Sequence, residues 1–435
     1  MESKEKLVHP TFAEAFRFWV KLGFISFGGP SGQIAIMHTE LVEKRRWIAE
    51  DRFLNALNFC MLLPGPEAQQ LATYIGWLLH RTWGGIVAGA FFVLPSMFIL
   101  WALSLVYVRF GTVSWIASIF YILKAAVLAI VLSAVLRIGK KALRNHVMWG
   151  IAALAFVAIF FLKLPFPLII AGAALIGYWG GKLAPHYFNI QQGHSSKSPP
   201  TVLEEGKPHP SPGWKRAFKI ISVCLLLWWL PLLFIFFWLG PAHTIFQEGL
   251  FFSKAAMVTF GGAYAVLPYV SQQAVENFGW LSATQMMDGL GLAETTPGPL
   301  IMVLQFVGFV GAYQHPMGLP PLVAATLGAF ITTWTTFLPC FLWIFVGAPH
   351  IEQLQRKPKI NNALSAVTAS VVGVILNLAV WFGLHLLFPE RKLDWFALLV
   401  AVVVFAGMTR WRWNIMAVVA GSGLLGLIHY FLKAS

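Results

Sequence analysis

Charged side chains are scarce in this sequence of 435 residues: Asp, Glu, Lys and Arg together make up only 11% of it. Soluble domains carry about 25%, and a chain that is 58% hydrophobic cannot hide so many apolar residues in a water-soluble core. The composition therefore disfavours a soluble enzyme and indicates a polytopic membrane protein. Negative charges are scarcer than positive ones: the chain has 17 Asp and Glu against 31 Lys and Arg, so its formal net charge is +14.

Cysteine is rare, and enzyme motifs are absent from the sequence. Cys60, Cys224 and Cys340 stand singly in apolar stretches, without the spacing of a zinc site or a disulfide framework. We expect them to pack as small hydrophobic residues. The sequence has no HExxH, GxSxG or P-loop motif and no His cluster at metal-ligand spacing. It therefore predicts no enzyme, no cofactor and no pump that hydrolyses ATP by itself.

Long apolar runs fill most of the chain. A bilayer core requires about 20 apolar residues in a helix, and runs near that length cover 84–108, 113–136, 147–163, 165–182, 217–239, 319–347, 361–388, 394–408 and 413–432. Four more apolar stretches are interrupted by Gly and Pro, at 12–38, 53–79, 244–271 and 284–313. The polar N-terminus lacks the apolar core of a signal peptide, so we expect the first segment to remain. The predicted fold class is an all-α polytopic membrane protein.

Residues 184–216 form the one clearly polar stretch, rich in Pro, Ser and Gly. This composition is typical of a linker that buries too little apolar surface to fold alone. It divides the chain into a first membrane repeat, 1–183, and a second, 217–435.

The two halves repeat in sequence. Shifting 18–66 by 233 positions places it on 251–299 without a gap, and 12 of the 49 aligned pairs are identical. The identities include both helix breakers: Phe27-Gly28-Gly29 falls on Phe260-Gly261-Gly262, and Pro64-Gly65-Pro66 falls on Pro297-Gly298-Pro299. Internal duplication with paired, Gly/Pro-interrupted apolar segments is the sequence signature of secondary transporters.

Basic loops indicate the topology, because Lys and Arg accumulate on the cytoplasmic side. The basic clusters are Arg137, Lys140, Lys141 and Arg144; the Lys and Arg residues of the linker; Arg356, Lys357 and Lys359; and Arg410 and Arg412. We therefore expect the N-terminus and linker in the cytoplasm. Segment 217–239 has no counterpart in the first half, so the repeats start an odd number of segments apart and are inverted.

The interrupted segments allow two models. Each could cross the membrane fully, or each could be a re-entrant hairpin of two half-helices. Loop 39–52 carries four basic residues, whereas its counterpart 272–283 carries none, and re-entrance keeps those cations inside. Half-helices 53–63 and 67–79 would span only about 17 and 20 Å, short of the ~30 Å core. We favour re-entrance.

A helix broken inside a membrane exposes amides that lipid cannot satisfy, so the break must line a cavity or bind something. Helix N-termini and free N–H groups suit an anion, and glycine allows close approach of a ligand. Packing kinks at close helix contacts are the alternative. The expected substrate-binding residues at the breaks are Ser26, Phe27, Gly28, Gly29, Ser31, Gln33, Pro64, Gly65, Pro66, Gln69, Gln70, Thr259, Gly261, Gly262, Thr295, Thr296 and Gly298.

Four charged residues near the breaks are candidates for function, since charges inside the membrane are costly. Lys21 and Lys254 occupy equivalent positions six residues before the Phe-Gly-Gly breaks; they could neutralise a divalent oxyanion or snorkel to the surface. Glu67 follows one Pro-Gly-Pro and Glu294 precedes the other. Either carboxyl group could carry a coupling proton, and either could instead cap a half-helix.

These motifs resemble the chromate ion transporter (CHR) family in its long, two-domain form. In the first half the resemblance lies in residues 21–30, Arg46-Trp47, residues 63–77 and Leu94-Pro95-Ser96. In the second half it lies in residues 259–264 and 295–299. The halves depart from each other where Pro30 corresponds to Ala263 and where residues 67–70 correspond to 300–303. The two half-sites are therefore expected to be unequal.

The resemblance implies a bacterial inner-membrane transporter that exports chromate, driven by the proton motive force, with a link to sulfate, which chromate mimics. The expected partners are chromate, sulfate, protons and membrane lipid, with a homodimer among the expected assemblies. Nucleic acid is not expected, because the positive charge mainly marks cytoplasmic loops. The alternatives are a sulfate importer or other oxyanion carrier, an anion channel, and a membrane enzyme that reduces the metal.

Overall fold

The computed structural model describes residues 9–188, 213–350 and 358–434, and every regular element in these ranges is a helix. The first half contains α1 (Phe12–Ile25), α2 (Gly29–His38), η1 (Thr39–Lys44), α3 (Glu50–Cys60), α4 (Glu67–Phe110), α5 (Ser114–Ala142), α6 (His146–Phe160), α7 (Phe166–Leu183) and α8 (Pro185–Phe188). Most of the expected linker, together with Arg356 and Lys357 of a basic cluster, lies outside the described residues.

The second half begins with α9, which starts at Trp214 and therefore includes the last residues of the expected linker. Its elements are α9 (Trp214–Leu239), α10 (Thr244–Val258), α11 (Ala263–Ser271), η2 (Gln272–Asn277), α12 (Ala283–Thr295), η3 (Leu300–Met302), α13 (Val303–Gln314), α14 (Pro321–Gly347), η4 (Ala348–His350), α16 (Pro358–Leu387), η5 (Pro389–Arg391), α17 (Trp395–Arg410) and α18 (Ile415–Ala434).

Seven helices in the described ranges are long and apolar enough to cross a membrane: α4, α5, α7, α9, α14, α16 and α18. Helices α6 and α17, expected from apolar runs, are shorter, with 15 and 16 residues. The prediction of an all-helical, multi-pass membrane protein is therefore confirmed.

Helix α4 contains two of the expected segments. The backbone leaves helical geometry at His80 and Arg81, and the two pieces of α4 then pack against each other. Their backbones touch at glycine, because a Cβ atom added to Gly76 would lie 2.4 Å from the Gly84 carbonyl oxygen. The first piece, 67–79, is thus a short helix, as expected from the sequence.

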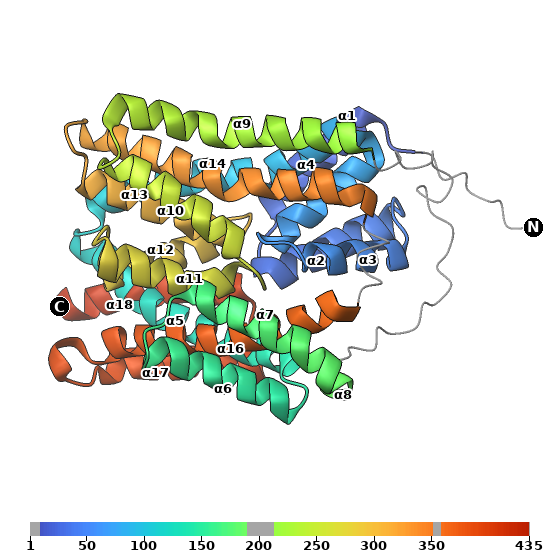
Figure 1. The fold of residues 1–435 in the computed structure, drawn as a ribbon. Helices are drawn as coiled ribbons and strands as arrows, with labels where there is room; N and C mark the ends of the chain where they lie inside the picture. The colour runs from blue at the N-terminus through green and yellow to red at the C-terminus, as the bar shows by residue number, and fades with distance from the viewer. Residues whose placement is uncertain (1–8, 189–212, 351–357, 435) are drawn as a thin grey trace, which may run out of the picture.

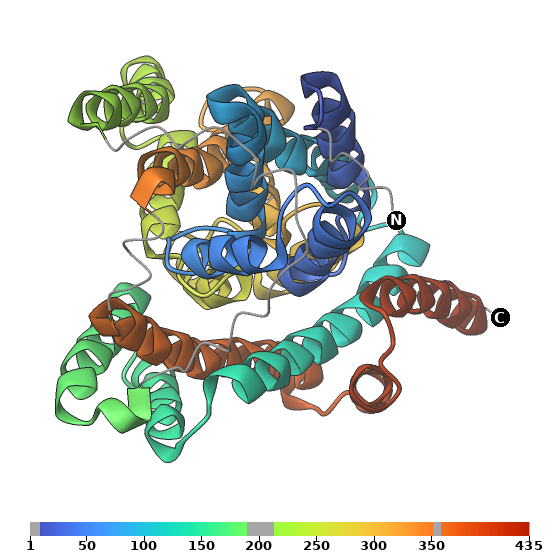
Figure 2. The same ribbon diagram turned by 90° about the vertical axis from the view of Figure 1, so that its right-hand side faces the viewer.

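The helices form two layers (Figures 1 and 2). Helices α5–α8 pack with α16–α18 in one layer, and α1–α4 pack with α9–α14 in the other. Each layer draws elements from both halves of the sequence, so neither half is a layer by itself. The layers meet where α12 contacts α5 and where α11 contacts α16.

The layer of α1–α4 and α9–α14 has its short helices at opposite ends of the bundle. Helices α1, α2 and α3 lie toward one end, on the right of Figure 1, whereas α10, α11, α12 and α13 lie toward the other, on the left. The expected Gly/Pro interruptions coincide with helix ends: α1 stops at Ile25 and α2 starts at Gly29, while α3 stops at Cys60 and α4 starts at Glu67. All four interruptions therefore lie between the two ends of the bundle.

Candidate functional site

The four interruptions meet through two hydrogen bonds that join the halves. The Gly65 amide donates to the carbonyl oxygen of Thr259 at 2.7 Å, and the Gly298 amide donates to that of Ser26, also at 2.7 Å. These bonds are equivalent, because a shift of 233 positions converts one donor into the other and one acceptor into the other. Each Pro-Gly-Pro segment therefore pairs with the Phe-Gly-Gly break of the opposite half. We call these two contacts the central junction.

Glycine is required at both donors of the central junction. Gly65 has φ of +125° and Gly298 has φ of +97°, values that strain any residue with a side chain. Space is also lacking, because a Cβ atom would lie 2.7 Å from Cys340 Sγ at Gly65 and 2.7 Å from Ser96 Cβ at Gly298. Cys340 and Ser96 follow the equivalent prolines of α14 and α4, so the surroundings of the two junctions correspond as well.

Glutamine side chains support the junction on one side. The Gln33 amide group donates to the carbonyl oxygen of Gly298 and, at 3.5 Å, to that of Ser26. Gln70 donates to the carbonyl oxygen of Pro64 at 2.8 Å, and Gln69 donates to Thr73 Oγ1 at 3.2 Å. All three glutamines are buried. The predicted polar residues of the first half thus hold the backbone around both Pro-Gly-Pro segments.

The Glu67 side chain of the first half lies against the Gly262 backbone of the second half. It belongs to the first turn of α4, and a Cβ atom added to Gly262 would lie 2.8 Å from Glu67 Oε1. Because Gly262 precedes α11, the carboxyl group lies where two helices begin, a place that favours negative charge. No ion pair between described residues includes Glu67.

The Glu294 carboxyl group has different neighbours. It lies near the end of α12 and accepts a hydrogen bond from the Tyr264 hydroxyl at 2.5 Å. The Arg137 charge on α5 lies near both residues, but no ion pair between described residues joins it to Glu294. Arg137 was expected only as part of a cytoplasmic basic cluster, because the apolar run ends before it.

The predicted hydroxyl donors at the breaks are already engaged with their own helices. Ser26, Thr259, Thr295 and Thr296 each donate to a carbonyl oxygen three or four residues earlier. A hydroxyl has a single proton, so none of these groups is a free donor in this conformation. Their oxygen lone pairs and the glycine backbone remain.

The other predicted residues are placed as follows. Lys21 and Lys254 are exposed on α1 and α10, and neither contacts the central junction. Ser31 and Gly261 are exposed, Phe27, Gly28 and Pro64 are partly buried, and Gly29 and Pro66 are buried. The glycines Gly28, Gly29, Gly261 and Gly262 all have positive φ.

Two polar sites lie outside the expected binding residues. Lys124 of α5 lies 3.6 Å from a carboxyl oxygen of Asp288 in α12, and the Tyr107 hydroxyl donates to the other oxygen at 2.9 Å. This ion pair is a polar contact between the layers. Glu248 of α10 is fully buried, and neither carboxyl oxygen has a hydrogen-bond partner. The sequence signal for Glu248 is an acidic residue within an apolar, repeated segment whose counterpart is Ala15.

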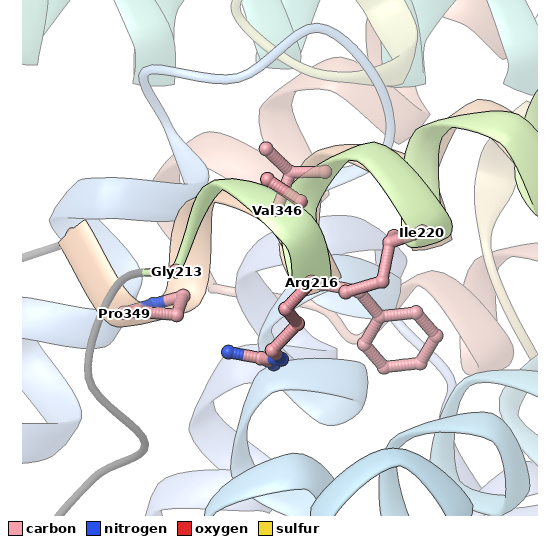
Figure 3. A pocket seen from close by; sticks show the side chains of 7 residues that line it. Gly213, Arg216, Ile220, Val346 and Pro349 are labelled. Carbon is pink, nitrogen blue, oxygen red and sulfur yellow. The ribbon is translucent and has the colours of Figure 1, made fainter.

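Two cavities lie away from the central junction. A small pocket where α9 begins and α14 ends is lined by Arg216, Phe345 and Pro349, among others (Figure 3). A larger cavity of about 210 Å³ lies between α6, α11, η2 and α16, and its lining includes Lys163 and Glu276. Among the described residues no three His, Cys, Asp or Glu side chains gather as metal ligands.

Comparisons with known proteins identify the family. The family model described as chromate transporter matches residues 13–178 and 246–427. The chromate transport protein of Cupriavidus metallidurans is 30% identical over 97% of this chain and 94% of its own. That of Pseudomonas aeruginosa is 29% identical over 96% and 92%, and the probable chromate transport protein of Synechococcus elongatus is 29% identical over 86% of each chain. No solved structure matches this chain. The chain belongs to the chromate transporter family, a family of transporters rather than enzymes, in its long form with two family segments.

Proposed function

We propose that this protein is a secondary active transporter that exports chromate, a tetrahedral divalent oxyanion, across a bacterial inner membrane. The central junction is the observation that carries the proposal. The Gly65 and Gly298 amides are paired across it, but α2, α4 and α11 begin beside it, and the first backbone N–H groups of a helix have no partner within the helix. Inside a membrane such groups need a polar partner. Backbone amides at helix N-termini bind oxyanions without a dedicated cation. Relatives similar over most of their length are named for chromate transport.

In this proposal the two halves are inverted repeats, and their broken segments are re-entrant hairpins. The matched hydrogen bonds of the central junction support this relationship, and so does the position of α1–α3 and α10–α13 at opposite ends of the bundle (Figure 1). The π-helical turns η1 and η2 also fall at equivalent positions, 233 residues apart. The N-terminus and linker would then be cytoplasmic, in agreement with the basic residues of the loop 39–52.

Alternating access would come from movement of one layer against the other. The layers divide each repeat, so the moving bodies would be α1–α4 with α10–α14 against α5–α7 with α16–α18. The contacts between them are mainly apolar, because one buried core includes Val127 of α5, Leu290 of α12 and Val371 of α16; they also include the Lys124–Asp288 ion pair. Movement would then be a small sliding of packed helices, during which this ion pair can exchange partners.

Proton coupling fits Glu67 better than Glu294. Glu294 has a tyrosine donor and a nearby arginine, both of which stabilise its ionised form. Glu67 has neither and lies against the glycine backbone of the opposite half. An oxyanion approaching the start of α11 would compete with the Glu67 carboxylate for the same positive helix end. Glu67 therefore links oxyanion binding to protonation, and export requires that the returning proton cross on a step in which no oxyanion is bound.

Uptake of labelled chromate into inverted membrane vesicles tests the proposed substrate. We expect saturable uptake, driven by a proton gradient and inhibited weakly by sulfate. If sulfate is carried better than chromate, the protein is a sulfate or general oxyanion carrier. Flux that ignores the pH gradient and is unchanged by Glu67→Gln would instead indicate an anion channel. Loss of chromate through chemical reduction, without transport, would indicate an enzyme.

A further inference from the structure

Glu248 is a buried acid that the central junction does not use. It lies in the second turn of α10 with an exposed fraction of 0%. Both carboxyl oxygens lack a hydrogen-bond partner, and the nearest main-chain donor is the Ala312 amide of α13. Buried polar groups are nearly always paired, so a carboxyl group left in this state needs an explanation.

Glycines of α13 and α14 make the space for this carboxyl group. A Cβ atom at Gly311 would lie 2.7 Å from Glu248 Oε1, and one at Gly328 would lie 2.7 Å from Oε2. The Thr332 hydroxyl is buried without an acceptor at the same helix crossing, against Gly308. The crossing of α13 and α14 thus holds two buried polar groups without partners, the Glu248 carboxyl group and the Thr332 hydroxyl group, which is more than an ordinary close helix contact requires.

No ion pair between described residues includes Glu248, and the cation on its own helix, Lys254, is six residues further on and exposed. Helices α13 and α14 carry no Asp, Glu, Lys or Arg, and the titratable groups of α11 are Tyr264 and Tyr269. In α9, Leu232 lies against Gly249, the residue after Glu248. The last cation of α9 is Lys219, thirteen residues before Leu232 and so about 20 Å away along the helix. An ionised carboxylate without a partner is costly in such surroundings, so the group is neutral here.

A histidine at the start of α10 is the candidate that passes a proton to Glu248. His243 caps the start of α10, five residues before Glu248, and its Nε2 atom is buried without a partner. Its Nδ1 atom accepts a hydrogen bond from the Ile245 amide. Burial lowers the pKa of His243, so the ring is neutral near pH 7 and can pass on a proton without holding one. The His315 ring, at the end of α13, contacts the Gly279 carbonyl oxygen.

Helix α10 connects Glu248 with the central junction. The helix ends at Val258, and the next residue, Thr259, accepts the hydrogen bond of Gly65. Eleven residues separate Glu248 from Thr259, about 16 Å of helix. A shift of the junction would therefore move Glu248 against the glycines of α13 and α14. The first half has Ala15 at the equivalent position, so this site exists once per chain.

We propose that Glu248 is a proton-binding site of the transport cycle, separate from the central junction and open to the side of His243. The proton binds to a carboxyl oxygen when α10 is packed as seen here, and it leaves when α10 shifts and the carboxyl group meets water. This inference rests on the proposed function, because it assigns a second proton to the same oxyanion transport.

Measurement of the coupling ratio tests the proposal. Purified protein in proteoliposomes is held between opposing pH and chromate gradients, and the gradient pair that stops net flux gives the number of protons moved per chromate. We expect Glu248→Gln to lower that number by one relative to the wild type. The matched control is Glu276→Gln, which changes an exposed carboxyl group bonded to Trp381 of the same half, and it should keep the wild-type ratio.

The possible outcomes distinguish failure of the proposed function from failure of the Glu248 site. Absence of chromate flux in the wild type would contradict the proposed function. Flux with an unchanged ratio in Glu248→Gln would overturn the inference alone, as would a ratio that depends on Na⁺ in place of H⁺. Should Glu248→Gln not fold, Glu248→Ala restores the residue of the first half. Infrared difference spectra must then show a protonated-carboxyl band in the wild type that Glu248→Ala lacks; identical spectra would also overturn the inference.

Discussion

The Gly65 amide and the Thr259 carbonyl oxygen, 194 positions apart in the sequence, form a hydrogen bond of 2.7 Å in the middle of the protein. Its counterpart joins Gly298 to Ser26 at the same distance. Each half therefore satisfies the broken backbone of the other. This reciprocity explains why a membrane protein can keep four helix breaks: the exposed amides and carbonyl groups that lipid would leave unpaired find partners across the junction.

Replacing Gly65 by alanine tests whether the junction requires glycine. The added Cβ atom would strain a backbone at φ of +125° and collide with Cys340 Sγ. We expect a loss of about 1–3 kcal/mol in stability and a fall in chromate flux of ~10-fold or more. Thermal unfolding in detergent and vesicle uptake measure the two effects. The control is Gly172→Ala in α7, where a Cβ atom meets nothing within 4 Å and alanine favours the helix. Equal behaviour of the two variants would refute the requirement.

Replacing Gln33 by glutamate tests the support of the junction. The Gln33 amide group donates to the carbonyl oxygens of Gly298 and Ser26, whereas an ionised carboxylate can only accept. We expect Gln33→Glu to reduce flux more than Gln33→Ala, because the carboxylate of the glutamate would repel the two carbonyl oxygens. The control is Gln285→Glu, since Gln285 accepts a hydrogen bond from the Ser282 amide, a role that glutamate fills. Flux assays on the three variants should place Gln33→Glu lowest; any other order would count against this role.

Removing one partner of the Lys124–Asp288 pair tests the contact between layers. The side chains are 17% and 8% exposed, and a buried charge left alone costs about 3–5 kcal/mol. We expect Asp288→Asn to lower stability strongly, and the double variant with Lys124→Met to recover most of the loss. Lys44→Met, at the exposed Lys44–Glu40 pair, should cost less than about 1 kcal/mol. Chemical unfolding measures all of these. Additive single and double losses would show that Lys124 and Asp288 are not coupled.

Accessibility of single cysteines tests the proposed topology. The native Cys60, Cys224 and Cys340 are buried, so an introduced cysteine should dominate labelling. We expect Arg46→Cys, between η1 and α3, to react with membrane-impermeant reagents only from the cytoplasm, and Asn277→Cys of η2 only from outside. Both residues are exposed. Labelling of Arg46→Cys from outside would favour full membrane crossing over re-entrant hairpins.

The helix breaks were predictable from the sequence because Gly and Pro act locally. Positive φ at Gly28 or Gly298 ends a helix, and a proline beside such a glycine removes a further backbone amide; prolines without a neighbouring glycine, such as Pro95 and Pro339, lie inside helices. The apolar runs likewise predicted the long helices, since length and composition decide which segments can cross a bilayer. The tight turn at His80 was less evident, because its glycine contact between Gly76 and Gly84 depends on the packing of two helices.

The contacts across the junction could not be predicted, because nothing in the sequence pairs Ser26 with Gly298. The repeat relates Gly298 to Gly65, yet the partner of each lies in the other half. Arg137 was missed as a site residue because it belongs to a run of basic residues that marks topology. Its place near Glu294 depends on how α5 packs against α12. Glu248 was missed because the repeat aligns it with Ala15, so it belongs to none of the motifs that the two halves share.

Chromate flux through the purified protein in proteoliposomes tests the central claim most directly. With an imposed pH gradient and the membrane potential clamped, the account predicts chromate movement that reverses when the pH gradient is reversed. It also predicts that Gly65→Ala lowers this flux ~10-fold or more and that Gly172→Ala preserves it. Chromate flux that is absent, or that persists at the same rate without any pH gradient and in Gly65→Ala, would contradict the account.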